Sequence, residues 1–274
     1  MAPIGTKLFD DVAAIMREVS AEVIEPRWGS LGHREVKSKS PGETVTVADE
    51  EAEALLSARL VSQWPQVPVV GEEACSANPE LAGLLESGRA WLVDPLDGTA
   101  NFVAGSPDWA VMVALVEDGI TVASWIWQPV NQIMYMAELG NGAVRNGAPL
   151  PTGSGSCDPS EMRGVVYARF LDRRTGGMVA ANARHFASVK PGQACAGHEY
   201  PAVAEGEEDF VLFWRTLPWD HAPGVLLVSE TGGAAIRLDG IAYRPGAPGN
   251  GLLVTASEAA WPAVNGSLLS LHSP

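Results

Sequence analysis

Hydrophobic positions recur at helical spacing near the start of the chain. Between Leu8 and Ile24 they return every three or four residues, which predicts a long amphipathic helix that ends near Pro26. A polar loop is expected over 29–44. A second helical pattern begins around Asp49 and places its apolar residues on one face.

Short apolar runs then indicate strands. Val67–Val70 and Arg89–Val93 have the unbroken apolar pattern of buried strands, and Pro95 is expected to block continuation of the second. Turn-forming residues separate three further runs, as in an antiparallel meander. These runs are 111–116, 121–127 and 132–137.

The glycine- and serine-rich segment 147–156 interrupts all periodicity and predicts a boundary between two halves, 1–150 and 151–274. In the second half, strands are expected at 163–167 and 186–190 around a helix at 175–184. Another helix is expected over Pro223–Thr231, closed by Gly232 and Gly233. A final helix is expected within 256–271.

Composition narrows the class of protein. A chain of 274 residues with 46% hydrophobic residues can form one large domain or two closely packed ones. The formal charge of -15 disfavours nucleic acid as a partner, so a bound phosphate is expected to need a metal. The three cysteines lack zinc or redox spacing, and no signal or membrane segment is apparent, so we expect a cytoplasmic protein that does not enter a membrane.

The segment Asp94-Pro95-Leu96-Asp97-Gly98-Thr99 carries the most informative chemistry. An apolar strand ends there in two carboxylates, and glycine allows a tight turn, so Asp94 and Asp97 are expected to converge. The amides of Gly98 and Thr99 could hold an anionic oxygen beside a cation. An acidic surface turn is the alternative for this pair taken alone.

Two further acidic features have the same ambiguity. Glu72 and Glu73 follow a predicted strand, and Asp220 lies just before the predicted helix near Ala222. A carboxylate there could cap the helix or bind a cation. Asp49 could likewise cap its own helix. The hypothesis of a metal site therefore depends on the combination of these residues.

Together these motifs resemble the inositol monophosphatase family of metal-dependent phosphatases, across most of the chain up to Gly233. The resemblance implies a layered α-β-α-β-α fold of the α+β or α/β class. It also implies two or three magnesium ions, a homodimer and inhibition by lithium.

The resemblance also implies roles for individual residues. The carbonyl of Leu96 and four carboxylates would bind magnesium, and Gly98 and Thr99 would bind phosphate. Asp49, Thr99 and Glu72 would act in catalysis, with Asp49 and Thr99 orienting or deprotonating an attacking water and no covalent phosphoenzyme. The four carboxylates are Glu72, Asp94, Asp97 and Asp220.

Substrate residues are expected in the second half, where the chain departs from the family pattern. Phe213 occupies the position of an acidic residue that contacts inositol hydroxyls. The segment 195–200 replaces a segment of small residues that the family has there. Its residues His198, Glu199 and Tyr200 could form a polar substrate pocket or be structural. His221 is interpreted as facing solvent or satisfying a local bond, and the tryptophans at 109, 125 and 127 as core or subunit contacts.

The resulting prediction is a magnesium-dependent phosphomonoesterase for a small phosphorylated polyol or sugar, with inositol 1-phosphate as the default. Histidinol phosphate, fructose 1,6-bisphosphate and a 3′-phosphonucleotide remain alternatives. A catalytically silent protein that binds phosphorylated ligands is the alternative from another class.

Overall fold

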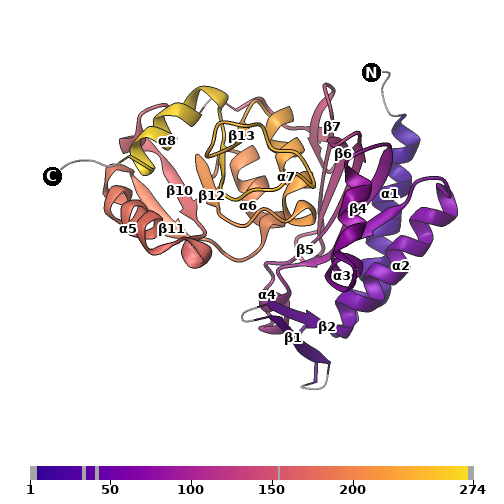
Figure 1. Cartoon of the computed structure of the whole chain (residues 1–274). Coiled ribbons are helices and arrows are strands. Elements are labelled where there is room, and N and C mark those ends of the chain that lie inside the picture. The colour runs from indigo at the N-terminus through magenta and orange to yellow at the C-terminus, as the bar shows by residue number, and fades with distance from the viewer. Residues whose placement is uncertain (1–4, 33–34, 41–42, 154, 271–274) are drawn as a thin grey trace.

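The computed structural model describes residues 5–32, 35–40, 43–153 and 155–270. Two sheets, one on each side of position 150 along the chain, alternate with three layers of helices (Figure 1). The order of layers is α1 and α2, the larger sheet, α6 and α7, the smaller sheet, and α5 and α8. The expected α-β-α-β-α layering is therefore confirmed.

The described residues up to 150 form a seven-stranded sheet, a two-stranded pair and four α-helices. The strands of the sheet lie in the order β3-β4-β5-β6-β7-β8-β9, and β1 pairs with β2. The elements are α1 (Thr6–Val19), β1 (Val36–Ser40), β2 (Glu43–Thr46), α2 (Val47–Gln63), β3 (Val69–Gly71), α3 (Glu72–Ala77), β4 (Arg89–Asp97), α4 (Thr99–Val103), β5 (Ala110–Glu117), β6 (Ile120–Gln128), β7 (Ile133–Glu138), β8 (Gly142–Arg145) and β9 (Ala148–Pro149).

The remaining residues form a five-stranded sheet and four helices. Its strand order is β11-β10-β12-β14-β13, in which β10, β11 and β12 are parallel. The elements are β10 (Arg163–Val166), α5 (Arg173–Asn182), β11 (Ser188–Pro191), α6 (Ala196–Ala204), β12 (Phe210–Phe213), α7 (Pro218–Glu230), β13 (Ala234–Arg237), β14 (Leu252–Thr255) and α8 (Trp261–Leu268).

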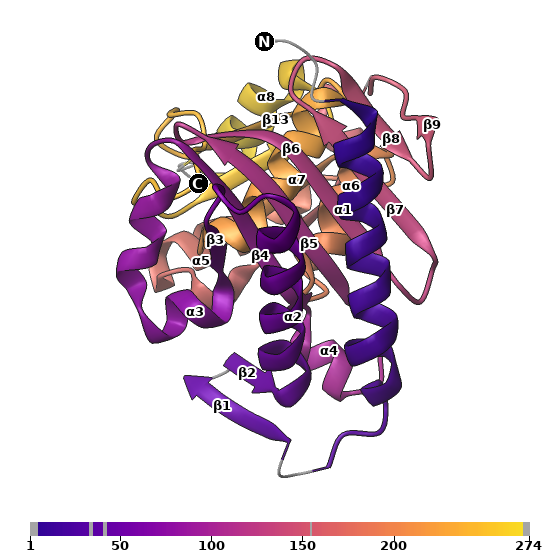
Figure 2. The same ribbon diagram turned by 90° about the vertical axis from the view of Figure 1, so that its right-hand side faces the viewer.

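Hydrophobic burial explains the layers. The apolar stripe of α1 packs with α2 on one face of the larger sheet, as Figure 2 shows. The other face of that sheet packs on α6 and α7, so β5 is buried along nearly its whole length and the predicted meander β5-β6-β7 is confirmed. Within the described residues no helix is both long and apolar enough to cross a bilayer.

Three local predictions need correction. Within the described part of the expected polar loop over 29–44, β1 and the start of β2 form an antiparallel pair that continues to Thr46; their mixed polar residues gave no clear strand pattern, and positions 33, 34, 41 and 42 lie outside the described residues. β4 does not stop before Pro95 but runs to Asp97. A β-bulge places Pro95 and Leu96 opposite Val111 alone, so the lack of a backbone N–H at Pro95 does not end the strand. Helix α7 begins at Pro218, which suits a first helical position, rather than near Ala222.

Candidate metal centre and active site

Strand pairing brings the first two acidic segments together. β3 and β4 are parallel, with Gly71 paired to Val93, so Glu72 and Asp94 follow adjacent positions at the same edge of the sheet. The backbone amide of Leu96 donates to Asp94 Oδ1 at 3.0 Å, which fixes that carboxylate within the bulge. Asp97 lies at the end of the same strand.

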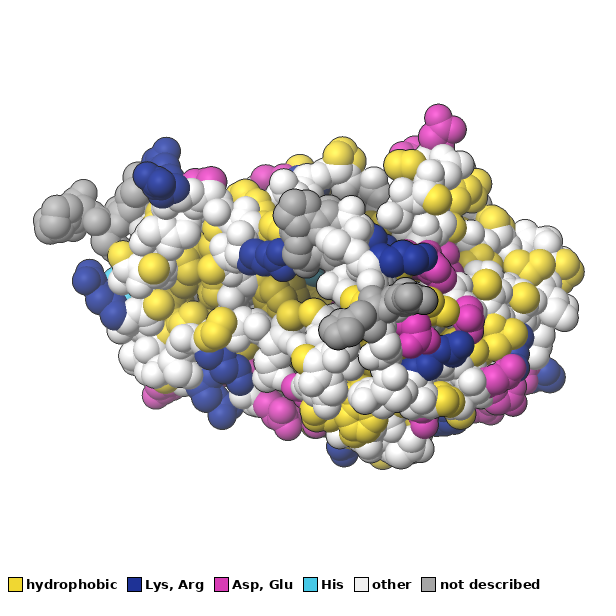
Figure 3. Space-filling view, turned by 90° about the horizontal axis from the view of Figure 1, so that it is seen from below, with side chains coloured by type: hydrophobic (Ala, Val, Ile, Leu, Met, Phe, Trp, Pro, Cys, Tyr) yellow, Lys and Arg dark blue, Asp and Glu magenta, His cyan; other side chains and the backbone are white. Residues whose placement is uncertain are grey.

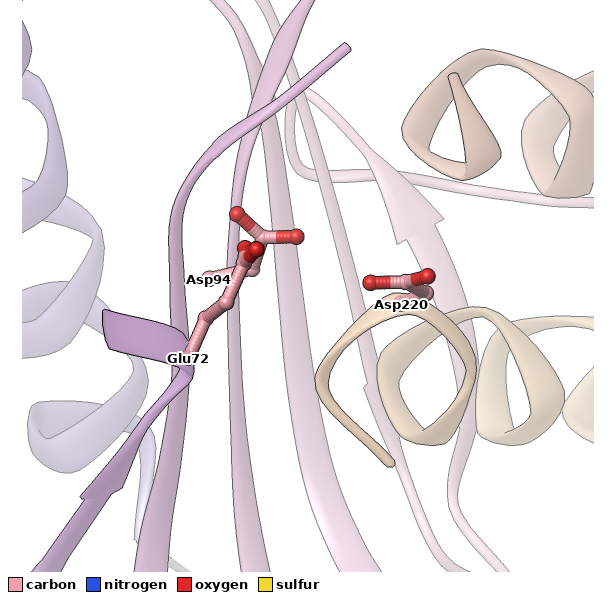
Figure 4. Close-up of side chains that lie close together, drawn as sticks. All are labelled: Glu72, Asp94 and Asp220. Atoms are coloured by element: carbon pink, nitrogen blue, oxygen red, sulfur yellow. The ribbon is translucent and has the colours of Figure 1, made fainter. Parts of the chain in front are cut away.

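Asp220 approaches from the other half of the chain, in the first turn of α7. A carboxylate is favourable there because the helix N-terminus carries partial positive charge. Figure 4 shows its carboxylate facing those of Glu72 and Asp94, and one oxygen from each of the three lies within 4.8 Å of the others. The structure therefore brings together three of the four predicted acidic ligands at a single point.

Asp97 lies beside this cluster and is held by different partners. Its Oδ2 accepts hydrogen bonds from the amide of Gly197 at 2.6 Å and from the thiol of Cys195 at 3.0 Å. Asp97 and Leu96 both line the cavity that contains the cluster.

The electrostatics of the cluster fit a hard cation. Burial raises the pKa of Asp94 well above its usual range, and the charges of Glu72, Asp97 and Asp220 raise it further. Burial likewise raises the pKa of Asp220. A divalent cation would offset this repulsion, and oxygen donors without thiolate or imidazole ligands suit magnesium better than zinc.

Lys39 supplies a positive charge that sequence reasoning did not assign to the site. Its Nζ lies 3.0 Å from Glu72 Oε1 and 2.5 Å from Glu73 Oε1, and it reaches them from β1. A lone lysine in a polar segment has no distinctive pattern. Only the position of the hairpin beside α3 shows that Lys39 faces the carboxylates.

Asp49 and Thr99 form a second polar group beside the metal centre. Thr99 Oγ1 lies 2.9 Å from Asp49 Oδ1 and 3.0 Å from the carbonyl oxygen of Leu96, so its single proton can go to either acceptor. Asp49 Oδ2 accepts from the amide and the hydroxyl of Thr46, which completes a capping box at the start of α2. Asp49 is thus both a cap and a partner of Thr99.

Gly98 makes the turn between β4 and α4 possible. Its φ of +84° is left-handed, and a Cβ at this position would lie 2.9 Å from the carbonyl oxygen of Asp108. Gly98 and Thr99 both line the cavity beside the carboxylates. These two residues therefore lie where the sequence placed a phosphate site.

The four residues predicted to contact substrate are placed differently from one another. Phe213 lines the cavity. Glu199 and Tyr200 are buried behind its wall and do not line it, because Glu199 accepts from the amide of Gln193 at 2.7 Å and Tyr200 bonds to His221. His198 lies outside the cavity, with Nε2 3.3 Å from the carbonyl oxygen of Trp109.

His221 makes local hydrogen bonds and does not face solvent, so the second of its two sequence interpretations applies. Its Nε2 donates to the carbonyl oxygen of Arg215 at 2.9 Å, because a carbonyl can only accept. Nδ1 then accepts the hydroxyl of Tyr200 at 2.7 Å. Burial lowers the pKa of His221 to about 4, so the imidazole is neutral at physiological pH.

The part of the cavity wall that belongs to the second half is aromatic and basic. Phe213 packs between the rings of Tyr167 and Tyr200, with centroids 4.9 and 5.1 Å away. Sequence reasoning assigned no role to the further lining residues, because they lie in loops without a recognisable motif. These residues are Tyr167, Arg169, Phe170, Trp214 and Arg215.

The raised pKa values predict a pH dependence of stability without metal. For Asp49, burial raises the pKa to about 6, and Asp94 and Asp220 also exceed the roughly 4 of an unfolded chain. The folded state then binds more protons than the unfolded state, so the melting temperature with chelator should fall as pH rises from about 4.5 to 7.5.

Magnesium should act in the opposite direction. Its ligands must be ionised, so the increase in melting temperature on adding magnesium should grow with pH. Calorimetry across this pH range, with chelator and with magnesium, measures both effects. A chelated protein that becomes steadily more stable up to pH 7.5 would contradict the electrostatic account.

Comparisons with known proteins identify relatives over nearly the whole chain. A model of the inositol monophosphatase family matches residues 9–269. An inositol-1-monophosphatase of Rhizobium meliloti is 31% identical over 218 residues, or 78% of this chain and 79% of that protein. A fructose-1,6-bisphosphatase/inositol-1-monophosphatase of Thermotoga maritima is 31% identical over 218 residues, or 78% of each.

A solved structure shows the same fold. The IMPase of Thermotoga maritima superposes with a TM-score of 0.78 at 25% identity, over 95% of this chain and 96% of that chain.

Proposed function

Because the chain belongs to the inositol monophosphatase family and is a phosphatase for phosphate monoesters, we propose that magnesium bound by its carboxylate cluster supports the reaction. The convergence of Glu72, Asp94 and Asp220 from three separate elements carries this proposal. Asp97 and the carbonyl of Leu96 complete the proposed ligands. Two or three ions are proposed from the likeness to the family.

The proposed cation supplies charge neutralisation for phosphate oxygens and lowers the pKa of water. The amides of Gly98 and Thr99 donate hydrogen bonds to phosphate oxygens. A pocket of carboxylates alone would repel a phosphate ester, so this cavity suits its substrate only with cations present.

Asp49 and Thr99 prepare the attacking water. When Thr99 donates its proton to Asp49 Oδ1, its oxygen can accept a hydrogen bond from water. Asp49, whose pKa burial raises to about 6, can then accept a proton through Thr99. Water attacks phosphorus in line and loses its proton through Thr99 to Asp49, while the bond from phosphorus to the leaving oxygen breaks and that oxygen takes a proton from solvent water. No covalent phosphoenzyme forms.

The proposed substrate is a small phosphorylated polyol or sugar. Inositol 1-phosphate is the reference ester, and the relative named as a fructose-1,6-bisphosphatase/inositol-1-monophosphatase supports testing sugar esters beside it. Phe213 lines the cavity but cannot accept hydrogen bonds from hydroxyl groups. The leaving alcohol must therefore find other partners.

Phosphate release from a panel of esters tests this function. The panel contains inositol 1-phosphate, fructose 1,6-bisphosphate, histidinol phosphate and a 3′-phosphonucleotide, each with magnesium and with chelator. We expect release from at least one ester with magnesium and none with chelator. Binding without release from any ester would favour the silent binder.

Two broader properties concern the compartment and the oligomeric state. Cys75, Cys157 and Cys195 are free thiols, which suits a reducing cytoplasm. A homodimer is proposed from the family, and light scattering of the purified protein tests it. Trp109, Trp125 and Trp127 are buried in the chain and so contribute to its core rather than to a subunit surface.

A further inference from the structure

The parallel strands of the smaller sheet deliver their following loops to the cavity. β10 pairs with both β11 and β12, so all three carboxyl ends lie at one edge. Ligands of sheets built from parallel strands bind at such an edge. The segment 167–170 after β10 and the segment 214–215 after β12 both line the part of the cavity that belongs to the second half.

Two arginines and a phenylalanine stand together on this wall. The guanidinium carbon of Arg169 lies 5.2 Å from the ring centroid of Phe170, and that of Arg215 lies 4.9 Å from the same centroid. Phe170 is 40% exposed, and all three residues line the cavity. Figure 3 shows a hollow in this face with hydrophobic side chains inside it and basic side chains beside it.

Arg169 and Arg215 give this wall positive charge and hydrogen-bond donors. Among described residues that line the cavity, the only carboxylates are those of the metal centre, Glu72, Asp94, Asp97 and Asp220. Arginine offers donors only, and planar guanidinium groups bind phosphate and carboxylate well. In a chain with a formal charge of -15, two arginines at one wall of this cavity stand out.

From this arrangement we infer that Arg169 and Arg215 bind a second anionic group, a phosphate or a carboxylate, on the alcohol that leaves. The inference rests on the proposed function and adds the substrate class. It places the scissile phosphate at the carboxylate cluster and the second anion at the arginine wall. An ester that carries an ammonium group, such as histidinol phosphate, is disfavoured by like charge.

Matched esters that differ in one anionic group test the inference. Fructose 1,6-bisphosphate is compared with fructose 1-phosphate, and 6-phosphogluconate with glucitol 6-phosphate. We expect kcat/KM to be at least about tenfold higher for the member with the second anion in one pair, as expected for one charge-assisted hydrogen bond. The pair that shows the difference tells phosphate from carboxylate.

Substitutions assign the effect to the wall. Arg169→Gln and Arg215→Gln should each reduce that ratio about tenfold, and Arg215→Lys should restore part of it. The backbone carbonyl that binds His221 is unaffected by either change at 215. Arg174→Gln, on the exposed first turn of α5, is the matched control and should keep the ratio.

The outcomes separate this inference from the proposed function. Equal kcat/KM values within both pairs, or an equal loss for both members in the arginine variants, overturn the inference while phosphatase activity stands. If no ester is hydrolysed, the proposed function fails. In that case, calorimetric titration of the same four esters into the Asp49→Asn variant with magnesium decides the inference. The Kd of the member with the second anion must be lower than that of its partner by the same factor of about ten.

Discussion

The Asp94→Asn variant should reduce the rate of magnesium-dependent phosphate release by more than about 100-fold. Removing a residue that only hydrogen-bonds to a metal ligand costs up to about 100-fold, and Asp94 is proposed to bind the metal directly. Asp94 lies in the middle of the carboxylate cluster, and its neighbours Glu72, Asp97 and Asp220 come from α3, β4 and α7. An amide keeps the acceptor for the amide of Leu96 but removes the charge that holds a cation.

The same variant should be more stable than the wild type when metal is absent. Burial and neighbouring charges raise the pKa of Asp94, so its ionised form destabilises the folded state at neutral pH. The melting temperature with chelator should therefore rise while its increase on adding magnesium shrinks. Opposite changes in activity and stability separate ligand loss from misfolding.

Asp118→Asn serves as the matched control for Asp94. Asp118 lies in the turn between β5 and β6, where its carboxylate accepts from the amide of Gly88 at 2.7 Å. The same chemical change there should leave activity and magnesium stabilisation unaltered. Full magnesium-dependent turnover by Asp94→Asn would remove Asp94 from the proposed centre.

The Asp49→Asn variant should have the second largest effect, a fall in kcat of about 10² to 10⁴ with a small change in KM, as expected for loss of general acid–base assistance. The carboxylate accepts from Thr99 through one oxygen and from Thr46 through the other. Asparagine has a single acceptor oxygen and cannot serve both. Pre-steady-state and steady-state phosphate release measure the loss.

Thr46→Ala separates the capping role of Asp49 from its catalytic role. Loss of the Thr46 hydroxyl removes half of the capping box and should cost about 1 kcal/mol of stability. The bond between Asp49 and Thr99 remains, so kcat should fall much less than in Asp49→Asn. If both variants lose turnover equally, Asp49 acts only by holding the start of α2.

Much of the metal centre was predictable because its determinants are local. A strand that ends in Asp94, Asp97 and Gly98 forces close carboxylates and a tight turn within six residues. The same holds for Thr46 and Asp49, whose spacing defines a capping box. Amphipathic periodicity likewise predicted α1 and the meander, since each face must meet core or solvent.

Substrate recognition was less predictable because it depends on packing between distant segments. Glu199 and Tyr200 have the chemistry of a pocket, yet α6 turns them into the interior. Arg169 and Arg215 have no motif, yet parallel strands place them on one wall. Whether a side chain faces the cavity depends on the order of the strands and on the rotation of its helix about the helix axis.

Residue type and spacing were enough to indicate the family, the candidate acidic residues and the alternation of helices and strands. Only the folded chain shows that Asp220 meets Glu72 and Asp94, that Lys39 pairs with Glu72, and that two arginines line the same cavity. Such contacts join residues far apart in the chain. They arise only when burial of apolar surface fixes the layers relative to each other.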